Sequence, residues 1–315
     1  MCSKIQKNQI LKASYAKINL FLKVLSKRKD GFHNICSMIH KIDLCDYLSF
    51  EPSSQLVVEC DVDLGIEQTQ NIVYKAAVAL NEVSGENNAV HIKIEKNIPV
   101  GAGLGGGSSN AATTLLTLNE LWDLNLEFDI LENIASVLGS DVPFFLHDVS
   151  RALVIGKGDI VIPYHEYKSL YEDLYYLLVH PNININTAKA YSLLNRDFDE
   201  RFKDITIRGS KWDMACYMGE LNYMQILSIK DDPRNKKNMF YRNDFEEVIL
   251  YENPELLFLQ YELKPLATDK KASMTGSGSA FFSLFDDLER AQAAEKKIQK
   301  HFSDKNYKTF VGQLI

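Results

Sequence analysis

The chain has 315 residues, of which 46% are hydrophobic and 24% charged, and its formal net charge is -7 at pH 7. This length predicts two domains rather than one core, and the composition excludes a disordered or fibrous protein. The acidic balance argues against nucleic acid as a partner, because nucleic-acid-binding proteins present a basic surface.

The cysteines, histidines and apolar runs exclude further classes. Five cysteines are scattered without a Cys-x-x-Cys pair, and the seven histidines have no metal-ligand spacing, so we expect reduced thiols and no zinc site. The N-terminal residues have no apolar signal-peptide core, and the longest apolar runs are too short to span a membrane. We therefore expect a cytoplasmic protein without a membrane partner.

The first periodic segment is an alternating strand at residues 15–24, followed by a turn at residues 28–33 that contains the Asp30-Gly31 hairpin signal. One face of this strand carries Lys17 and Asn19. The local pattern alone explains both as the solvent-facing side of a half-buried strand.

An amphipathic helix at residues 71–83, ending before Gly85, is expected between two further strands at residues 56–59 and 91–95. The second strand leads into Pro99–Asn110, where five glycines fall within seven residues. Glycine allows positive φ and exposes backbone N–H groups, and the following helix directs its N-terminus at the same place. The segment therefore predicts a phosphate site, with Ser108 or Ser109 capping the helix.

A helix at residues 128–138 is expected to stop at Gly139 and to present Asp141, which alone is explained as a turn or cap residue. Strands at residues 152–162 close the first domain. We place the domains at residues 1–165 and 166–315.

The second domain is expected to contain both strands and helices. A polar loop at residues 230–238 and a second glycine turn at residues 274–279 interrupt it. The other expected elements are a strand at 174–180, a helix ending at 194, a mostly helical stretch at 196–263, a strand at 280–285, a helix at 288–302 and a strand at 307–312.

Three familiar phosphate motifs do not fit the glycine segment. Gly101-x-Gly103-x-x-Gly106 matches the dinucleotide fingerprint, but the strand before it alternates and Pro99 intervenes. A Walker loop needs a Gly-Lys-Ser/Thr ending, and the glycine segment has no lysine there. Eukaryotic-type kinases carry His-Arg-Asp and Asp-Phe-Gly, and neither motif occurs in the chain.

The stretch from residue 99 to 112 instead resembles the phosphate-binding motif of the GHMP small-molecule kinases. Its triple glycine looks most like the branch of 4-diphosphocytidyl-2-C-methyl-D-erythritol kinases. Supporting motifs follow in order: Ala16-Lys-Ile-Asn-Leu20, Asp30-Gly-Phe-His33, Gly139-Ser-Asp-Val-Pro-Phe144, Asn243-Asp-Phe-Glu246 and Thr275-Gly-Ser-Gly278.

The resemblance implies an α+β fold of two domains, the first like domain 2 of ribosomal protein S5 and the second ferredoxin-like. It also implies transfer of the γ-phosphoryl group of ATP, with Mg²⁺, to a hydroxyl. In this branch the acceptor is the 2-hydroxyl of a cytidine diphosphate methylerythritol, in the non-mevalonate route to isoprenoid precursors.

The resemblance also assigns roles to residues. Asp141 takes the position of the base, and Lys17 that of the lysine which keeps it ionised and polarises the nucleophile. Ser108 is expected nearest the metal, with Ser109 as the alternative. The ATP-binding residues would be Pro99, Val100, Gly101, Ala102, Gly103, Leu104, Gly105, Gly106, Gly107, Ser108 and Ser109, with Asn71 and Lys96 on the adenosine side.

The acceptor side rests on the same resemblance. His33 would read the cytosine, Phe32 stands where the family has tyrosine and would stack on the base, and Tyr191 would cover its other face. Asn19, Thr187, Gly276 and Gly278 would contact the rest of the substrate.

Two alternatives stay open. Another GHMP kinase, such as a homoserine or mevalonate kinase, is disfavoured by the Gly-Phe-His element and the triple glycine. A non-catalytic nucleotide-binding protein of the same fold is disfavoured because both Lys17 and Asp141 are present.

Overall fold

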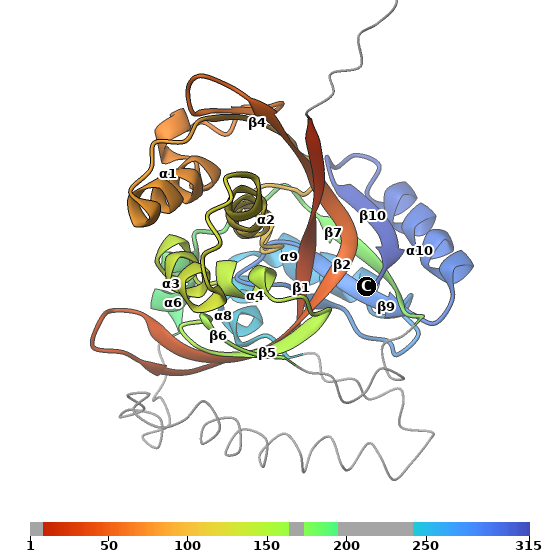
Figure 1. The fold of residues 1–315 in the computed structure, drawn as a ribbon. Helices are drawn as coiled ribbons and strands as arrows, with labels where there is room; N and C mark the ends of the chain where they lie inside the picture. Colours follow the sequence, from red (N-terminus) through yellow and green to blue (C-terminus); the bar gives the residue numbers. More distant parts are fainter. Residues whose placement is uncertain (1–8, 164–172, 195–241) are drawn as a thin grey trace, which may run out of the picture. The chain divides into compact units, whose positions relative to one another are not determined.

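The computed structural model describes residues 9–163, 173–194 and 242–315. The expected polar loop at residues 230–238 lies outside them. In the described part, helices and strands are mixed along the chain (Figure 1), as the α+β expectation requires. None of the helices in these ranges combines the length and apolar composition needed to cross a bilayer.

The chain divides into two compact units that interleave along the sequence. The first unit contains residues 1–16, 44–100 and 105–148, and the second contains residues 17–43, 101–104 and 149–315. Two long strands, β1 (Ile10–Lys27) and β2 (His33–Pro52), contribute residues to both. A single domain boundary at residue 165 therefore stays a prediction.

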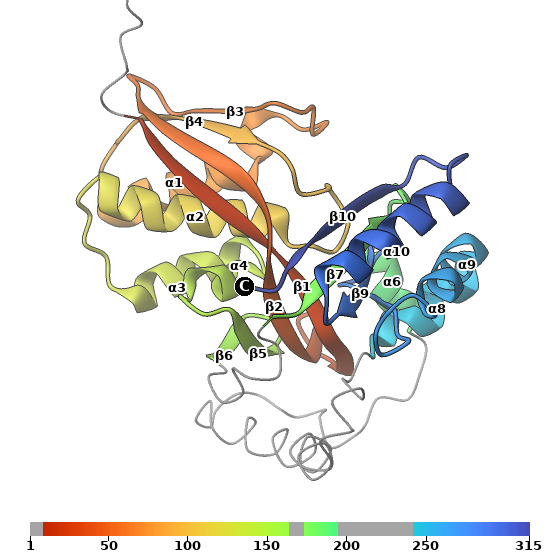
Figure 2. The same ribbon diagram turned by 90° about the vertical axis from the view of Figure 1, so that its right-hand side faces the viewer.

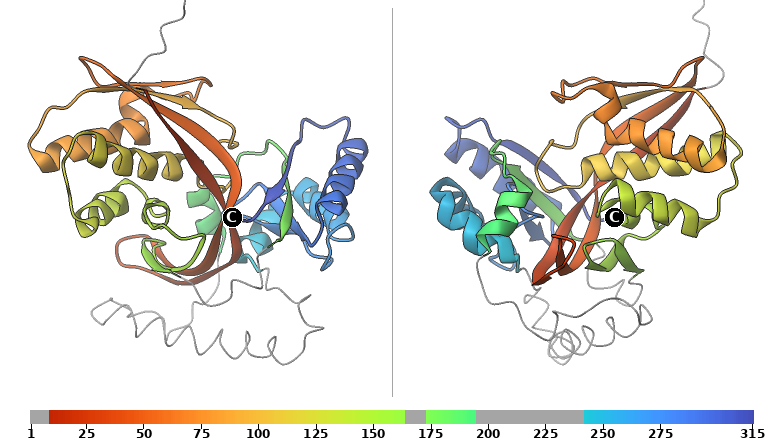
Figure 3. Two further views of the ribbon diagram at one scale, coloured as in Figure 1. Left: turned by 45° about the vertical axis from the view of Figure 1, so that its right-hand side comes forward. Right: turned by 90° about the vertical axis from the view of Figure 1, so that its left-hand side faces the viewer.

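In the first unit, residues 47–52 of β2 pair antiparallel with β4, which pairs in parallel with β3. The helices pack against one another, and Figure 3 shows them gathered on one side of these strands. The elements are β3 (Val57–Cys60), a 3-10 turn η1 (Gln68–Gln70), α1 (Ile72–Ser84), β4 (Val90–Glu95), α2 (Gly106–Leu121), α3 (Phe128–Leu138) and α4 (Val142–Leu146).

The helix ends of this unit follow from local chemistry. Asn71 caps α1 by accepting a hydrogen bond from the N–H of Val73, and Gly85 ends it in the left-handed region at φ 69°. One face of α1 is fully buried, through Val73, Ala76, Ala77 and Leu80. The predicted helices at residues 71–83 and 128–138 are thus confirmed within a residue or two.

The second unit contains two sheet segments. Residues 35–40 of β2 pair with β5 (Arg151–Gly156), which pairs with β6 (Ile160–Pro163). The other segment is a four-stranded antiparallel sheet in the order β10-β7-β9-β8. Its strands are β7 (Tyr175–His180), β8 (Ser273–Met274), β9 (Phe281–Phe285) and β10 (Lys308–Gln313).

Helices cover one face of this four-stranded sheet, as Figure 2 shows. They are α6 (Thr187–Leu193), α8 (Asp244–Glu252), α9 (Pro254–Leu263) and α10 (Leu288–His301). Their buried side chains form one cluster with Leu177 and Phe281 of the sheet and with Leu22 and Ile35 of the long strands. The core of the second unit therefore needs residues from both ends of the sequence.

Candidate active site

The glycine segment turns sharply before α2. Gly101, Gly103 and Gly105 have φ values of 70°, 79° and 71°, a region that favours glycine. The predicted cap at Ser108 or Ser109 is wrong: Gly105 is the N-cap, and the N–H of Ser109 already donates to the Gly105 carbonyl at 2.8 Å. The amides of residues 106–108 are then the ones without an intrahelical acceptor, as amides that bind an anion at a helix N-terminus must be.

The two serines after the glycines differ in their surroundings. Ser109 is 2% exposed, and its Oγ lies 2.7 Å from Oγ of Ser14 on β1. Ser108 is half-buried, and its Oγ would be 3.9 Å from a Cβ added to Gly139. The hydroxyl of Ser108 therefore lies against the turn that carries Asp141.

Asp141 directly precedes α4, whose five residues are all buried. Its side chain makes no capping hydrogen bond to that helix, so a cap does not explain the residue. Ile72, at the start of α1, would lie 3.8 Å from a Cβ on either Gly107 or Gly139. The first turns of α1 and α2 and the turn before α4 thus converge.

Lys96 lies beside the same helix end, 3.3 Å from the position of a Cβ on Gly106. Its ammonium group pairs with the buried carboxylate of Asp46. Asp46 also accepts hydrogen bonds from the N–H groups of Asn97 and Ile98, both at 2.8 Å. Asp46 therefore fixes the segment that leads into the glycines, a role that the sequence did not indicate.

In the second unit, Lys17 and Asn19 are buried on β1, with exposures of 3% and 2%. The local pattern, which alone explained both as solvent-facing, is wrong on this point, because residues 16–20 of the strand are all buried. Lys17 Nζ donates to Asn19 Oδ1 at 2.7 Å, and the N–H of Lys17 donates to the Leu104 carbonyl at 3.0 Å. The strand is therefore tied directly to the glycine segment.

The second glycine turn packs against the first. A Cβ on Gly103 would lie 2.2 Å from the Thr275 carbonyl oxygen, and one on Gly276 would lie 3.0 Å from Gly103. Asn243 supports this turn by donating to the carbonyls of Met274 and Gly276, both at 2.7 Å. Only glycines allow this contact between the two turns.

Glu246, at the other end of the Asn243-Asp-Phe-Glu246 motif, holds β8. Its carboxyl group accepts hydrogen bonds from Ser273 Oγ and the N–H of Met274. Burial raises the pKa of Glu246 above its usual value, against these hydrogen bonds. The first and last residues of the motif, Asn243 and Glu246, thus both hold the strand and turn at residues 273–276.

The residues expected around the acceptor are also in the second unit. The rings of His33 and Tyr191 stack on each other with centroids 4.6 Å apart and 13° between planes. Burial, with a smaller effect from Lys27, lowers the pKa of His33 and favours a neutral imidazole. Phe32 is 53% exposed, and Lys157 Nζ lies 5.5 Å from its ring centroid.

Thr187, at the start of α6, is hydrogen-bonded to Ser277 of the second glycine turn, with 2.7 Å between the hydroxyl oxygens. Gly278 has φ 96°, and a Cβ there would lie 2.6 Å from Met274 Sδ. α6 and the second glycine turn therefore meet at these polar residues.

The predicted site residues thus form two groups, one in each unit, joined by the glycine segment that belongs to both. Ser108, Asp141, Asn71 and Lys96 are in the first group, and Lys17, Asn19 and the acceptor residues are in the second. The pairing of Lys17 with Asp141 stays a prediction. Among the described residues, no cluster of three or more His, Cys, Asp or Glu side chains could hold a metal ion.

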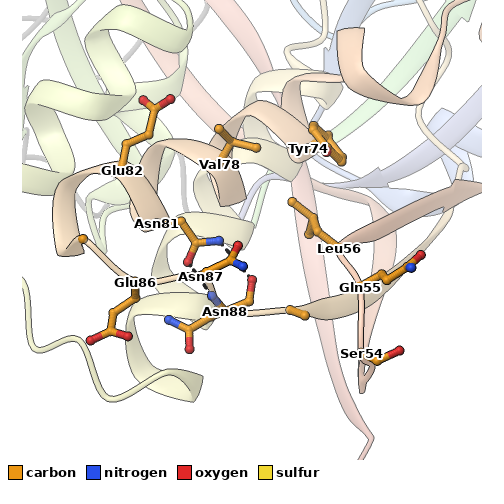
Figure 4. A pocket seen from close by; sticks show the side chains of 12 residues that line it. Ser54, Gln55, Leu56, Tyr74, Val78, Asn81, Glu82, Glu86, Asn87 and Asn88 are labelled. Atoms are coloured by element: carbon orange, nitrogen blue, oxygen red, sulfur yellow. Dashed lines mark hydrogen bonds between the residues drawn. The ribbon is translucent and has the colours of Figure 1, made fainter.

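A groove of about 700 Å³ opens elsewhere in the first unit (Figure 4). Tyr74, Val78 and Asn81 of α1 line it, facing Leu56 before β3 and Asn88 before β4. None of the predicted site residues takes part in it.

Comparison with known proteins identifies the family to which the chain is similar. The family model described as "GHMP kinases N terminal domain" matches residues 71–148, and "GHMP kinases C terminal" matches residues 227–304. The 4-diphosphocytidyl-2-C-methyl-D-erythritol kinase of Prochlorococcus marinus (strain MIT 9301) is 37% identical over 319 residues, covering 99% of this chain and 97% of that protein. The enzyme of the same name from Thermodesulfovibrio yellowstonii is 38% identical, covering 90% and 92%.

Two solved structures share the fold. A crystal structure of 4-(cytidine 5'-diphospho)-2C-methyl-D-erythritol kinase is 27% identical, covers 96% of this chain and 99% of that one, and has a TM-score of 0.70. A homoserine kinase from Cytophaga hutchinsonii has a TM-score of 0.71 at only 16% identity, with coverage of 100% and 97%. Kinases named for different acceptors therefore share this fold about equally, whereas the sequence identity is higher to the one named for the cytidine diphosphate compound.

Proposed function

This chain belongs to the GHMP kinases, and we propose that it transfers the γ-phosphoryl group of ATP to the 2-hydroxyl of 4-diphosphocytidyl-2-C-methyl-D-erythritol, giving the 2-phosphate and ADP. The observation that carries the proposal is full-length similarity to kinases of that name, at 37% identity over 99% of the chain. The reaction would be a step of the non-mevalonate route to isoprenoid precursors. The acidic net charge of -7 supports an enzyme that does not bind nucleic acid, and the scattered cysteines without a Cys-x-x-Cys pair support a cytoplasmic location.

Phosphoryl transfer needs positioning and charge neutralisation more than covalent chemistry from the protein. The first-turn amides of α2 would bind the phosphates, and Lys96, held by its ion pair with Asp46, would lie with Asn71 on the adenosine side. Asp141 would accept the proton of the 2-hydroxyl as its oxygen attacks the γ-phosphorus, and ADP would leave. Lys17 would stabilise the charge on the attacking oxygen.

The residues present suit Mg²⁺ bound mainly through the nucleotide. Mg²⁺ typically uses one or two protein ligands together with phosphates and water rather than an all-protein cage. Ser108 is the better hydroxyl ligand, because its Oγ lies against the Asp141 turn while the Ser109 hydroxyl is engaged with Ser14. When bound, Mg²⁺ would neutralise charge on the phosphate oxygens.

A direct assay tests the acceptor. The purified chain is incubated with ATP, Mg²⁺ and each of 4-diphosphocytidyl-2-C-methyl-D-erythritol, homoserine and mevalonate, and the product is identified by phosphorus NMR. We expect phosphorylation at the 2-position of the first compound alone. Turnover of homoserine or mevalonate in its place would refute the proposal, and a lack of turnover with all three would favour a non-catalytic nucleotide-binding protein.

A substitution tests the base. Asp141→Asn removes the proton acceptor while keeping the size of the side chain, so kcat should fall by roughly 10²-fold or more, as is usual for a general base. ATP affinity, followed with a fluorescent analogue, should stay near that of the wild type. Asp148→Asn, at an exposed aspartate just beyond α4, is the matched control and should retain full activity. An Asp141→Asn enzyme with a normal rate would exclude Asp141 as the base.

A further inference from the structure

The hydroxyl of Thr275 joins two parts of the second unit that are far apart in the sequence. Thr275 begins the second glycine turn and is completely buried. Its Oγ1 accepts a hydrogen bond from the N–H of Asn19 at 3.1 Å, and it lies 3.2 Å from Asn19 Oδ1 and 3.3 Å from the Gly103 carbonyl oxygen. A hydroxyl has one hydrogen, so it donates to one of these two oxygens at a time.

The orientation of the Asn19 amide follows from its partners. The N–H of Gly276 can only donate, and it lies 2.8 Å from Oδ1, which identifies that atom as the oxygen. The Nδ2 group then donates to Ser37 Oγ at 2.8 Å, and Ser37 donates its own hydrogen to the Phe21 carbonyl. One hydrogen of Asn19 Nδ2 and the hydroxyl hydrogen of Ser37 are thus both used within the protein.

The same Asn19 oxygen accepts the hydrogen bond from Lys17 Nζ at 2.7 Å. A lysine has a long side chain with many rotamers, so a buried acceptor at a fixed position restricts where its ammonium group can lie. Thr275 holds this acceptor by accepting from the backbone N–H of Asn19 and, when its hydrogen is not directed to the Gly103 carbonyl, by donating to the side-chain oxygen. The backbone N–H and the side-chain oxygen of Asn19 are therefore engaged within the protein.

We propose that Thr275 is a positioning residue for Lys17. It acts through Asn19, and its contact with the Gly103 carbonyl links the position of the ammonium group to the glycine segment. The proposal rests on the proposed function, in which Lys17 acts on the attacking hydroxyl. It gives Asn19 a role in supporting Lys17, beside the contact to the substrate that the resemblance implies.

Three variants distinguish the effect of losing the Thr275 hydroxyl from a general effect of substitution in the core. Thr275→Val keeps the shape but removes every hydrogen bond of Oγ1, so we expect kcat to fall on the order of 10-fold to 100-fold while the KM for ATP changes by less than about 3-fold. Thr275→Ser restores the hydroxyl and should restore most of kcat. Ser283→Ala is the matched control, because Ser283 is a buried hydroxyl on β9 without a hydrogen-bond partner among the described residues.

A double-mutant cycle identifies Lys17 as the group through which Thr275 acts. In a Lys17→Arg background, Thr275→Val should lower kcat by less than about 3-fold, since the ammonium group it positions is gone. An equal loss in both backgrounds, an unchanged kcat in Thr275→Val, or a failure of Thr275→Ser to recover would each overturn the proposal while leaving the proposed function intact. A Lys17→Arg enzyme as fast as the wild type would show that the reaction does not need the lysine ammonium group, and it would overturn the positioning proposal while the phosphorylation of the acceptor would still stand.

Ser37→Ala tests the same proposal if the Thr275→Val enzyme does not fold. Ser37→Ala removes the acceptor of Asn19 Nδ2 without touching either glycine turn. It should lower kcat by about 3-fold to 10-fold, and again by less in the Lys17→Arg background. Wild-type kcat in a folded Ser37→Ala enzyme would contradict the positioning of Lys17 through Asn19.

Discussion

His40 lies inside β2, opposite Arg151 of β5, and is 4% exposed. Burial, opposed by a hydrogen bond from Nδ1 to the Lys41 carbonyl and assisted by Arg151, lowers the pKa of His40 to about 4 from a usual 6.5. The unfolded chain therefore binds a proton between pH 6.5 and pH 4 that the folded chain does not, and the folded state loses stability as the pH falls through this window.

The size of this effect follows from the shift in the pKa. At about 1.4 kcal/mol per unit, the free energy of unfolding should fall by about 3 kcal/mol from this residue. Urea unfolding of His40→Gln at several pH values should show a shallower decline, while the exposed control His301→Gln should follow the wild type. Parallel curves for His40→Gln and the wild type would show that His40 is not the group responsible.

Single polar residues also mark the limit of what the sequence could provide. Lys17 and Asp141 were identified by resemblance, whereas the local pattern alone explained Lys17 as solvent-facing and Asp141 as a turn or cap residue. Asp46 and Ser37 gave no signal, because one polar residue in a strand is normally a solvent-facing one. Their roles depend on partners such as Lys96 and Asn19 that approach only after folding.

At the scale of elements, the start of α2 offers a test of the phosphate site. A Cβ on Gly107 would meet only Ile72, at an ordinary 3.8 Å, whereas one on Gly106 would lie 2.9 Å from Ile98 Cγ2. Gly107→Ala should therefore keep the fold, and alanine should even raise the free energy of unfolding by about 0.5–1 kcal/mol, because it favours a helix.

The same methyl group would crowd phosphates that approach the first-turn amides. The KM for ATP should rise by about 10-fold, equivalent to about 1.4 kcal/mol of binding. In the comparison variant Gly106→Ala, the free energy of unfolding should fall as well, because its methyl group would also press on Ile98. The two variants therefore distinguish crowding of the phosphates from strain in the protein. Unchanged ATP affinity in Gly107→Ala would exclude this helix end as the phosphate site.

Periodicity and terminal residues predicted most elements, including α1, α3, α10 and the strands β5, β6, β7, β9 and β10, but not β2 or the short β8. They misplaced the start of α2, because serine is usually the stronger cap and the consecutive glycines concealed a helical turn. They also gave β1 as a ten-residue half-buried strand, although it spans 18 residues and is buried on both faces at residues 16–20. Burial on the second face comes from elements distant in sequence, which a local window does not include.

At the scale of the whole molecule, the interleaved units allow a test of the predicted boundary at residue 165. Leu22, Val24 and Ile35 share a buried cluster with residues of β7, β9 and the C-terminal helices. Leu22 also bridges to Asn243, and Ile42 bridges to Leu314. A cut after residue 165 would therefore divide one hydrophobic core between two fragments.

We expect neither residues 1–165 nor residues 166–315 to fold alone, because each fragment would expose apolar surface that the other covers. Each should bind the dye ANS and lack a cooperative urea transition, and the two should co-purify when expressed together. A sharp unfolding transition in either fragment alone would instead support an independent domain ending near residue 165. In that case the contacts of Leu22 and Ile42 would join two folded domains, and disrupting them by Leu22→Ala should leave the stability of fragment 1–165 unchanged.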